Sequence, residues 1–263
     1  RIVEIEPSGI RKFFDIVNEM EDAISLGVGE PDFDTPWHIR DEGIFSLEKG
    51  RTFYTSNAGL KELREEICRY LSRRCKVDYT IDETLITVGG SEAIDLAMRV
   101  LLNPGDEVLI PQPSFVSYLP CAVLADGVPV VINLKAENEF RLTAQELEDA
   151  ITDKTKLLVL PFPNNPTGAI LSEKTLAALG DFLRQKEALY AKEIYLISDE
   201  PYREIVYDGR RAAFPADYYE DTILCYSYSK SLSLPGERIG YILVSPRAKS
   251  REDLFAAICG AGR

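Results

Sequence analysis

The chain has 263 residues, of which 45% are hydrophobic and 28% charged, and its formal net charge is −13. This length suits one large or two modest domains with an ample core. An acidic balance opposes nucleic-acid binding, which needs a basic face, so we expect no nucleic-acid partner. No apolar run reaches the roughly 18 residues that would cross a bilayer, so we also expect no membrane association.

Cysteine and histidine content narrows the chemistry further. Five cysteines are present without a C-x-x-C pair, which opposes a zinc site and a disulfide framework. The first residues show no signal-peptide pattern, so we expect reduced thiols in a cytoplasmic protein without a metal centre. His38 is the single histidine, which leaves little room for Ser-His-Asp, Cys-His or multi-histidine metal chemistry.

Helical patterns occupy the first part of the chain. An apolar stripe compatible with a helix contains Phe13, Phe14, Ile16, Val17 and Met20. A turn rich in glycine and proline follows it and runs to about residue 35. Apolar residues at helical spacing then predict helices at about 37–49 and 60–74.

From about residue 84, short β-rich runs alternate with helical patterns. The predicted strands are Leu85–Val88, Glu107–Ile110, Val128–Ile132, Lys156–Leu160, Ile194–Ser198, Thr222–Tyr226 and Ile239–Val244. The predicted helices are Ser91–Leu102, Phe115–Ala125, Ala144–Ile151, Glu173–Ala191 and Ser250–Cys259. This alternation predicts an α/β fold with a mainly parallel, buried sheet.

Small and polar residues follow the first predicted strand, in Gly89-Gly90-Ser91-Glu92. A helix that begins there presents free backbone N–H groups to an anion, and glycines allow close approach. Ser91 could equally be an ordinary helix cap, so a phosphate-binding turn and a simple cap are both open. The spacing matches neither the dinucleotide-binding glycine pattern nor the P-loop.

Polar side chains also follow two later strands. Asn165 lies in Pro161–Gly168, a loop stiffened by prolines, and Asp199 and Tyr202 follow the next apolar run. Ligands bind open α/β sheets at this edge. A buried aspartate seeks a cationic partner, such as a protonated pyridine nitrogen. A plain turn for the loop and a helix cap for Asp199 remain the alternatives.

The segment from Ser227 to Tyr241 places Lys230 among hydroxyl groups, with Arg238 further on. A lysine that forms an imine needs a lowered pKa and a carbonyl compound beside it. Arginine offers a planar fork of donors to a phosphate. Lysine beside a phosphate cradle suggests pyridoxal phosphate, whereas the alternative is a surface Lys and Arg flanking a loop.

Taken together, the motifs resemble those of fold-type I pyridoxal-phosphate-dependent aminotransferases, the aspartate aminotransferase superfamily (class I/II). The matching segments, in family order, are G-E-P-D-F-D-T-P at 29–36, G-G-S at 89–91, P-N-N-P-T-G at 163–168, S-D-E-P-Y at 198–202 and S-Y-S-K with its arginine at 227–238. The resemblance implies a three-layer α/β/α large domain over 36–263. Residues 1–35 would form an N-terminal arm and part of a small domain.

The resemblance also implies roles for the residues around the cofactor ring. Lys230 is similar to the lysine that forms the internal aldimine and moves the substrate's α-proton. Asp199 is similar to the acid that pairs with the pyridine nitrogen. Asn165 and Tyr202 resemble the pair that binds the phenolic oxygen. Phe115 matches the position of the stacking aromatic ring, where aspartate aminotransferases usually carry Trp, although a core role is the alternative.

Other positions match the phosphate and substrate sides of the family's site. Gly29 matches a backbone contact to the substrate carboxylate, and Tyr54 matches a tyrosine that reaches the neighbouring subunit's phosphate. The resemblance therefore implies a homodimer with shared active sites. The positions that match the phosphate-binding side are Gly90, Ser91, Glu92, Ser227, Ser229 and Arg238.

The implied activity moves an amino group between an L-amino acid and a 2-oxo acid, with aspartate-type or broad specificity. A C–S β-lyase shares every cofactor residue and is an alternative, as is a non-catalytic remnant that binds pyridoxal phosphate. Family members continue beyond the position equivalent to Arg263 with the rest of the small domain. We therefore expect a C-terminally truncated chain that binds the cofactor and is weakly active or inactive alone.

Overall fold

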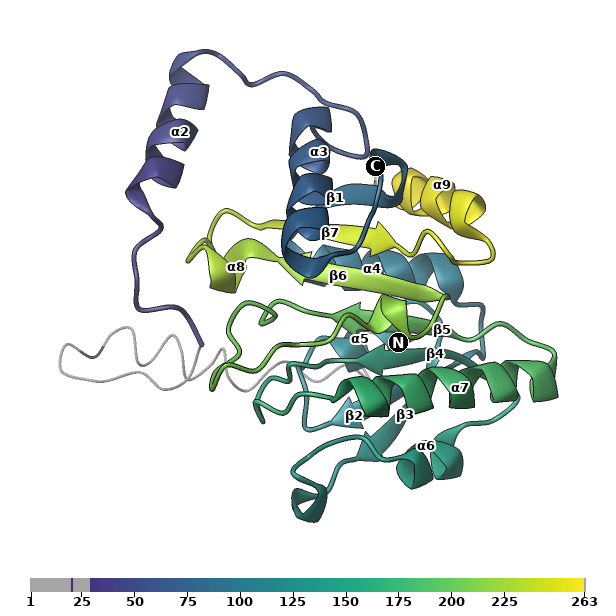
Figure 1. The fold of residues 1–263 in the computed structure, drawn as a ribbon. Helices are drawn as coiled ribbons and strands as arrows, with labels where there is room; N and C mark the ends of the chain where they lie inside the picture. Colours follow the sequence, from purple (N-terminus) through teal and green to yellow (C-terminus); the bar gives the residue numbers. More distant parts are fainter. Residues whose placement is uncertain (1–19, 21–28, 263) are drawn as a thin grey trace.

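The computed structural model describes Met20 and residues 29–262. Within them, seven strands form one sheet (Figure 1). The strands are β1 (Thr84–Val88), β2 (Glu107–Gln112), β3 (Val128–Asn133), β4 (Thr155–Leu160), β5 (Tyr195–Asp199), β6 (Thr222–Ser227) and β7 (Ile239–Val244). Each strand predicted from the sequence is present, with small shifts at its ends.

The sheet is mixed but mainly parallel, in the order β1-β7-β6-β5-β4-β2-β3. The strands β6, β5, β4, β2 and β3 are parallel to one another, whereas β7 runs antiparallel to both β1 and β6. The carboxyl ends of the other strands therefore meet at one edge of the sheet, together with the amino end of β7. This edge is called the carboxyl edge below.

Helices precede and separate the strands. They are α2 (Trp37–Glu48), α3 (Lys61–Tyr70) with a π-helical turn at Leu71–Cys75, α4 (Gly89–Leu101), α5 (Tyr118–Leu124), α6 (Ala144–Ala150), α7 (Glu173–Tyr190), α8 (Tyr228–Ser231) and α9 (Arg251–Ala261). Short 3₁₀ turns lie at Ile81–Glu83, Ala136–Asn138 and Pro215–Asp217. One helix differs from prediction: α5 begins at Tyr118 rather than at Phe115, because the residues after β2 form a turn.

The sheet is the middle of three layers (Figure 1). Buried residues of α4, α5 and α9 pack against one face of the strands, and α6 and α7 pack against the other face together with the end of α3. Every residue of β5 and β6 is buried, which is typical of a parallel strand covered on both faces. The predicted three-layer α/β/α fold is confirmed.

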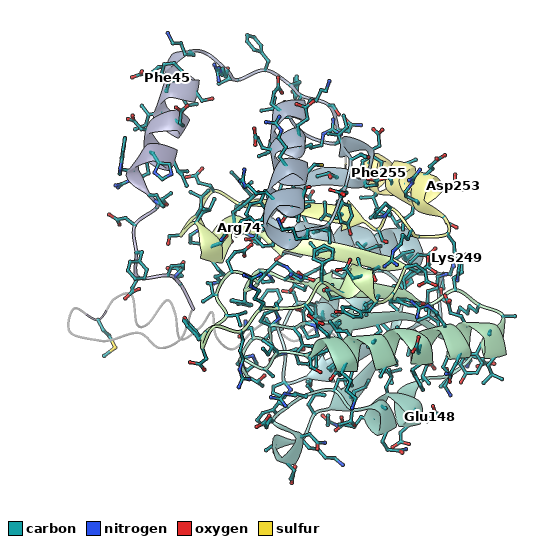
Figure 2. The ribbon with its side chains drawn as sticks, viewed as in Figure 1. Phe45, Arg74, Glu148, Lys249, Asp253 and Phe255 are labelled. Carbon is teal, nitrogen blue, oxygen red and sulfur yellow. The ribbon has the colours of Figure 1, made fainter. Side chains whose placement is uncertain are left out.

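The N-terminal part of the described chain is different. None of the residues of α2 is buried, and Figure 1 shows this helix standing away from the sheet. Figure 2 labels one of its apolar side chains, Phe45. The helix predicted around Phe13 lies outside the described residues except for Met20, which is exposed. The predicted boundary between 35 and 36 stays a prediction.

Within residues 29–262, no helix combines the length and the apolarity that crossing a bilayer requires.

Candidate active site

Six chain segments bring polar groups to the carboxyl edge of the sheet. The turn after β1 supplies Gly89 and Gly90, the loop after β4 supplies Asn165, and β5 ends at Asp199. The strand β6 ends at Ser227, α8 carries Lys230, and Arg238 directly precedes β7. Because parallel strands deliver their carboxyl ends to the same edge, residues far apart in sequence meet here.

The lack of room for a Cβ atom at two glycines shows how closely these segments approach each other. A Cβ atom on Gly89, whose φ is +76°, would lie 2.7 Å from Nη2 of Arg238. A Cβ atom on Gly90 would lie 3.4 Å from Cβ of Ser227 and 4.0 Å from Oδ1 of Asp199. The amino end of α4 therefore lies against both the hydroxyl-bearing end of β6 and Asp199.

Gly240, in β7, allows the backbones of β6 and of the turn after β1 to approach β7 closely. A Cβ atom there would lie 2.4 Å from the carbonyl oxygen of Tyr226 and 2.7 Å from the carbonyl carbon of Gly89. No side chain fits between these backbones. The sequence analysis did not single out this glycine, although a glycine inside a strand signals a close backbone approach.

Hydroxyl groups and an arginine line the same corner. The Ser227 hydroxyl accepts a 3.2 Å hydrogen bond from the backbone N–H of Ser229, and the two hydroxyl oxygens lie 2.8 Å apart. Both serines are buried. Arg238 has a left-handed φ of 55° and donates from Nη1 to the carbonyl of Pro235 at 2.9 Å. Ser91 is exposed at the start of α4.

Glu92 belongs to the same turn but its carboxylate faces the backbone. It accepts a hydrogen bond from the N–H of Val88, which precedes α4. An acid in the first turn of a helix also favours the positive end of the helix dipole. The structure therefore gives Glu92 a helix-capping contact at the edge of the predicted phosphate site.

Asp199 is a buried carboxylate whose partner is a neutral phenol. Tyr118, at the start of α5, donates a hydrogen bond to Oδ2 of Asp199 at 2.6 Å. Burial raises the pKa of Asp199 to about 6, and the hydrogen bond from Tyr118 opposes that rise. Among the described residues, no cation contributes to lowering the pKa of Asp199.

Tyr118 was missed from the sequence. Tyr118 is the first residue of α5, after the turn that follows β2. Its position at a helix start, close to the carboxyl end of a strand, was the one feature of the sequence that could have indicated a role in the site. Its ring meets the half-buried Phe115 ring edge to face, with centroids 5.8 Å apart. Phe115 and Asp199 therefore contact the same tyrosine.

The loop after β4 is fixed by a neighbour of Asn165. The side-chain oxygen of Asn164 accepts hydrogen bonds from the Thr167 backbone N–H at 3.1 Å and from its hydroxyl at 2.9 Å. Burial and the nearby Asp199 raise the pKa of Tyr202, and the neighbouring side chain of Asn165 lowers it. The structure thus brings together Asn165 and Tyr202, as the sequence predicts for the pair.

Lys230 lies on α8, beside the first residues of the described N-terminal segment. Burial lowers the pKa of its amine, and the Coulombic attraction of Glu30 opposes this effect. Its Nζ donates to the backbone carbonyl of Gly29. Lys230 and Gly29, which are distant in sequence, are therefore in contact, whereas Tyr54 is fully exposed.

An open surface cavity of about 390 Å³ lies elsewhere, at the opposite edge of the sheet. Its lining residues include Arg184, Glu187, Lys192 and Lys249. Each of these charged groups has an ion-pair partner within the chain. This cavity is separate from the cluster around Asp199 and Lys230.

Comparison with known proteins identifies the family. The model for aminotransferase class I and II matches residues 21–257. The chain belongs to this family. It is 38% identical over 263 residues to an aspartate aminotransferase of Pyrococcus horikoshii, of which it covers 66%, while 99% of the chain is matched. It is 40% identical to aromatic-amino-acid aminotransferase 2 of Thermococcus litoralis, with 92% of the chain and 62% of the relative covered.

A solved structure gives the same result for the fold. Aspartate aminotransferase from Thermus thermophilus with maleate superposes with a TM-score of 0.89 at 32% identity, covering 99% of this chain and 66% of that one. The chain thus spans less than two thirds of the length of these relatives. The predicted family resemblance is confirmed.

Pyridoxal phosphate is the cofactor of this family, and the residues at the carboxyl edge fit it. Its phosphate needs an anion site, which the amino end of α4, two serine hydroxyls and Arg238 provide. Its ring nitrogen is basic, and Asp199 is a buried carboxylate without a cationic partner among residues 29–262. Its aldehyde needs an amine of lowered pKa, which Lys230 provides.

Proposed function

We propose that the chain carries the cofactor site of an aminotransferase that moves an amino group from an L-amino acid to a 2-oxo acid. The donor becomes the matching 2-oxo acid and the acceptor becomes the matching amino acid. One observation supports this most strongly: buried Asp199 lies on the same sheet edge as an anion site and a lysine of lowered pKa. This arrangement suits a ligand with a basic ring and a phosphate.

Bound pyridoxal phosphate supplies an aldehyde that condenses with amines and a ring that withdraws electrons from the substrate's α-carbon. Lys230 is the residue that would hold the aldehyde end, by covalent attachment. Because burial lowers the pKa of its amine, Nζ is available both as a nucleophile and as a group that accepts and returns a proton.

Asp199 would hold the ring nitrogen, and Tyr118 orients Asp199. The carboxylate stays ionised when it faces a protonated ring nitrogen, since an adjacent positive charge lowers the pKa that burial has raised. Tyr118, at 2.6 Å, fixes the carboxylate's orientation from the other oxygen. Asn165 and Tyr202, whose side chains lie near each other, would orient the phenolic oxygen of the ring. Phe115 covers a face of the ring.

The amino end of α4 would hold the phosphate. Backbone N–H groups of Gly90 and Ser91 and the hydroxyl of Ser227 would donate to it, and Ser229 supports Ser227 through their 2.8 Å contact. Arg238 supplies the positive charge. Glu92 acts indirectly, by fixing the first turn of α4 through the Val88 N–H.

On the substrate side, Gly29 provides a backbone contact beside Lys230. We propose that residues 1–35 are the N-terminal arm of a small domain and that residues from 36 on form the large domain. Tyr54 and the apolar side chains of α2 are exposed, which supports a homodimer in which Tyr54 reaches the partner's phosphate.

Transamination is favoured over the β-lyase alternative, because the relatives reported above are aminotransferases by name. We also propose a cytoplasmic location. All five cysteines are free, and unpaired thiols are typical of a reducing compartment.

The site is tested by loading the chain with pyridoxal phosphate, reducing it with borohydride and mapping the modified peptide. We expect the pyridoxyl group on Lys230. Lys249, a half-exposed lysine at the other edge, serves as the internal control and should remain unmodified. A pyridoxyl group on any other lysine, or none at all, would contradict the site.

The activity is tested separately, by following the loaded chain's absorbance after adding aspartate, tyrosine or phenylalanine without an acceptor. Conversion of the bound cofactor to its amine form, with release of the 2-oxo acid, supports transamination. Pyruvate and thiol release from cystathionine, without amine transfer, would identify the β-lyase instead. If the absorbance of the bound cofactor does not change after any of these donors is added, the chain would be a remnant that binds the cofactor without catalysis.

A further inference from the structure

A buried ion pair lies directly behind the site. The side chain of Glu200 has no exposed surface, and that of Arg203 is 11% exposed. Two nitrogens of the Arg203 guanidinium contact Oε2 of Glu200, and the Ser198 hydroxyl donates to Oε1 at 2.6 Å. Neither charged residue has a role in the site described above.

Arg203 is held on its other side as well. Its Nη1 donates to the carbonyl of Ala212 at 3.1 Å and its Nη2 to that of Ala213 at 3.4 Å. Its guanidinium carbon lies 4.7 Å from the centre of the Phe214 ring. The guanidinium is therefore fixed in orientation by a carboxylate, two carbonyls and an aromatic face.

The pair connects to the site through the backbone. Side chains alternate along a strand, so Ser198 and Glu200 point to the face of β5 opposite Asp199. The Glu200 N–H donates to the carbonyl of Cys225 at 2.9 Å, and the Arg203 N–H donates to the carbonyl of Glu200 at 3.3 Å. The ion pair therefore closes the turn that begins at Asp199 and contains Tyr202.

We propose that Glu200 and Arg203 are positioning residues that set the direction of Asp199 and Tyr202 toward the cofactor ring. This rests on the proposed function. Stability alone does not explain the pair, because apolar residues of similar volume often replace a buried ion pair without loss. A planar guanidinium held at several points restricts the turn to one geometry, which an apolar pair would not do.

The test compares the unaltered chain with the double variant Glu200→Leu/Arg203→Met, which removes both charges and retains apolar volume. We expect cofactor-free unfolding temperatures close to each other. We expect pyridoxal phosphate affinity to fall about tenfold or more, since small displacements of binding groups are costly. The pH midpoint of the bound cofactor's absorbance should move by about one unit. A role limited to stability would leave this midpoint unchanged.

Two further variants test whether the effect depends on the planar guanidinium of Arg203 and whether it is specific to this ion pair. Arg203→Lys retains the charge and loses the planar fork, so it should shift the midpoint in the same direction. Glu220→Gln breaks a more exposed Arg–Glu pair, with Arg184, at the opposite edge of the sheet, and should leave affinity and midpoint unchanged.

The outcomes separate the two proposals. If the unaltered chain takes up no pyridoxal phosphate, the proposed function is wrong and this inference falls with it. If the unaltered chain binds the cofactor on Lys230 and both Arg203 variants match it in affinity and midpoint, the inference alone is overturned. If Glu220→Gln shifts the midpoint as much as the double variant, the effect is general and the inference is equally overturned.

Discussion

At the amino-terminal edge of the sheet, acidic groups are paired with cations, whereas at the carboxyl edge Asp199 has a phenol as its partner. Lys192 contacts Asp106 at 2.8 Å, and Lys249 contacts Glu187 at the same distance. Lys249 lies across the sheet from α8, which carries Lys230 (Figure 2). At the carboxyl edge, Tyr118 offers Asp199 a neutral hydrogen bond.

The pKa directions express this contrast. Burial raises the pKa of Asp106, but hydrogen bonds from Lys192 and the Asn103 backbone outweigh it, and the pKa lies below the ordinary value. Burial raises the pKa of Asp199 to about 6, and the bond from Tyr118 does not outweigh it. The charge of Asp106 is therefore satisfied within the chain, whereas Asp199 is a carboxylate that a cationic ligand would stabilise.

The largest expected effect is that of Asp199→Asn. Loss of the carboxylate should reduce amino transfer about a hundredfold or more, because the ring nitrogen loses its ion partner. The cofactor-free variant should nevertheless be more stable than the unaltered chain. Because the pKa of Asp199 is raised in the folded state, its contribution to the free energy of unfolding is fully present below about pH 4 and is lost as the pH rises through about 6. Asparagine does not ionise, so the variant avoids this loss.

The gain in stability should therefore appear only at higher pH. We expect up to about 3 kcal/mol at about pH 8 and little difference below about pH 4, measured by urea unfolding. An Asp199→Asn variant that is less stable than the unaltered chain at both pH values would show that the site edge satisfies its carboxylate after all.

A smaller effect is expected for Gly240→Ala. The added methyl group would meet backbone atoms of Tyr226 and Gly89, which cannot rotate away. We expect a loss of about 1–3 kcal/mol in unfolding free energy and weaker cofactor binding, since the turn after β1 must move. Gly236→Ala in the neighbouring loop is the matched control, because its Cβ would meet no atom within 4 Å. Equal effects of the two alanines on cofactor affinity would contradict this explanation.

The smallest effect is expected for Asp106→Asn at the amino-terminal edge. Loss of the charged hydrogen bond to Lys192 should cost about 1 kcal/mol at neutral pH. A lowered folded-state pKa means that this stability is present above the unfolded pKa and is lost as pH falls, so acid should abolish the difference. Cofactor affinity should not change. A change in affinity would show that the two edges are coupled.

Much of the fold was predictable because the strands are continuous apolar runs. The strands β4, β5 and β6 are covered on both faces, and each carries an apolar run: Leu157–Leu160 in β4, Tyr195–Ile197 in β5 and Ile223–Tyr226 in β6. The start of α5 was not predictable, because Phe115 and Val116 suit a helix as well as they suit the turn that they form.

The candidate site divides in the same way. Asn165, Asp199 and Lys230 follow apolar strands directly, and the rule that strand ends meet places them together. Tyr118 reaches Asp199 from α5, and local sequence does not say which helix covers which face of the sheet. Arg203 pairs with Glu200, only three residues away, but its contacts with the carbonyls of Ala212 and Ala213 depend on the course of a loop that local sequence does not give.

The pKa of Asp199 itself tests the contrast between the edges most directly. Carboxyl carbon NMR of selectively labelled aspartate, assigned with the Asp199→Asn variant, can follow it with and without pyridoxal phosphate. We predict a midpoint of about 6 in the cofactor-free chain and a carboxylate that stays ionised well below this pH once the cofactor is bound. A cofactor-free midpoint at the ordinary aspartate value of about 4, unchanged by the cofactor, would contradict the account.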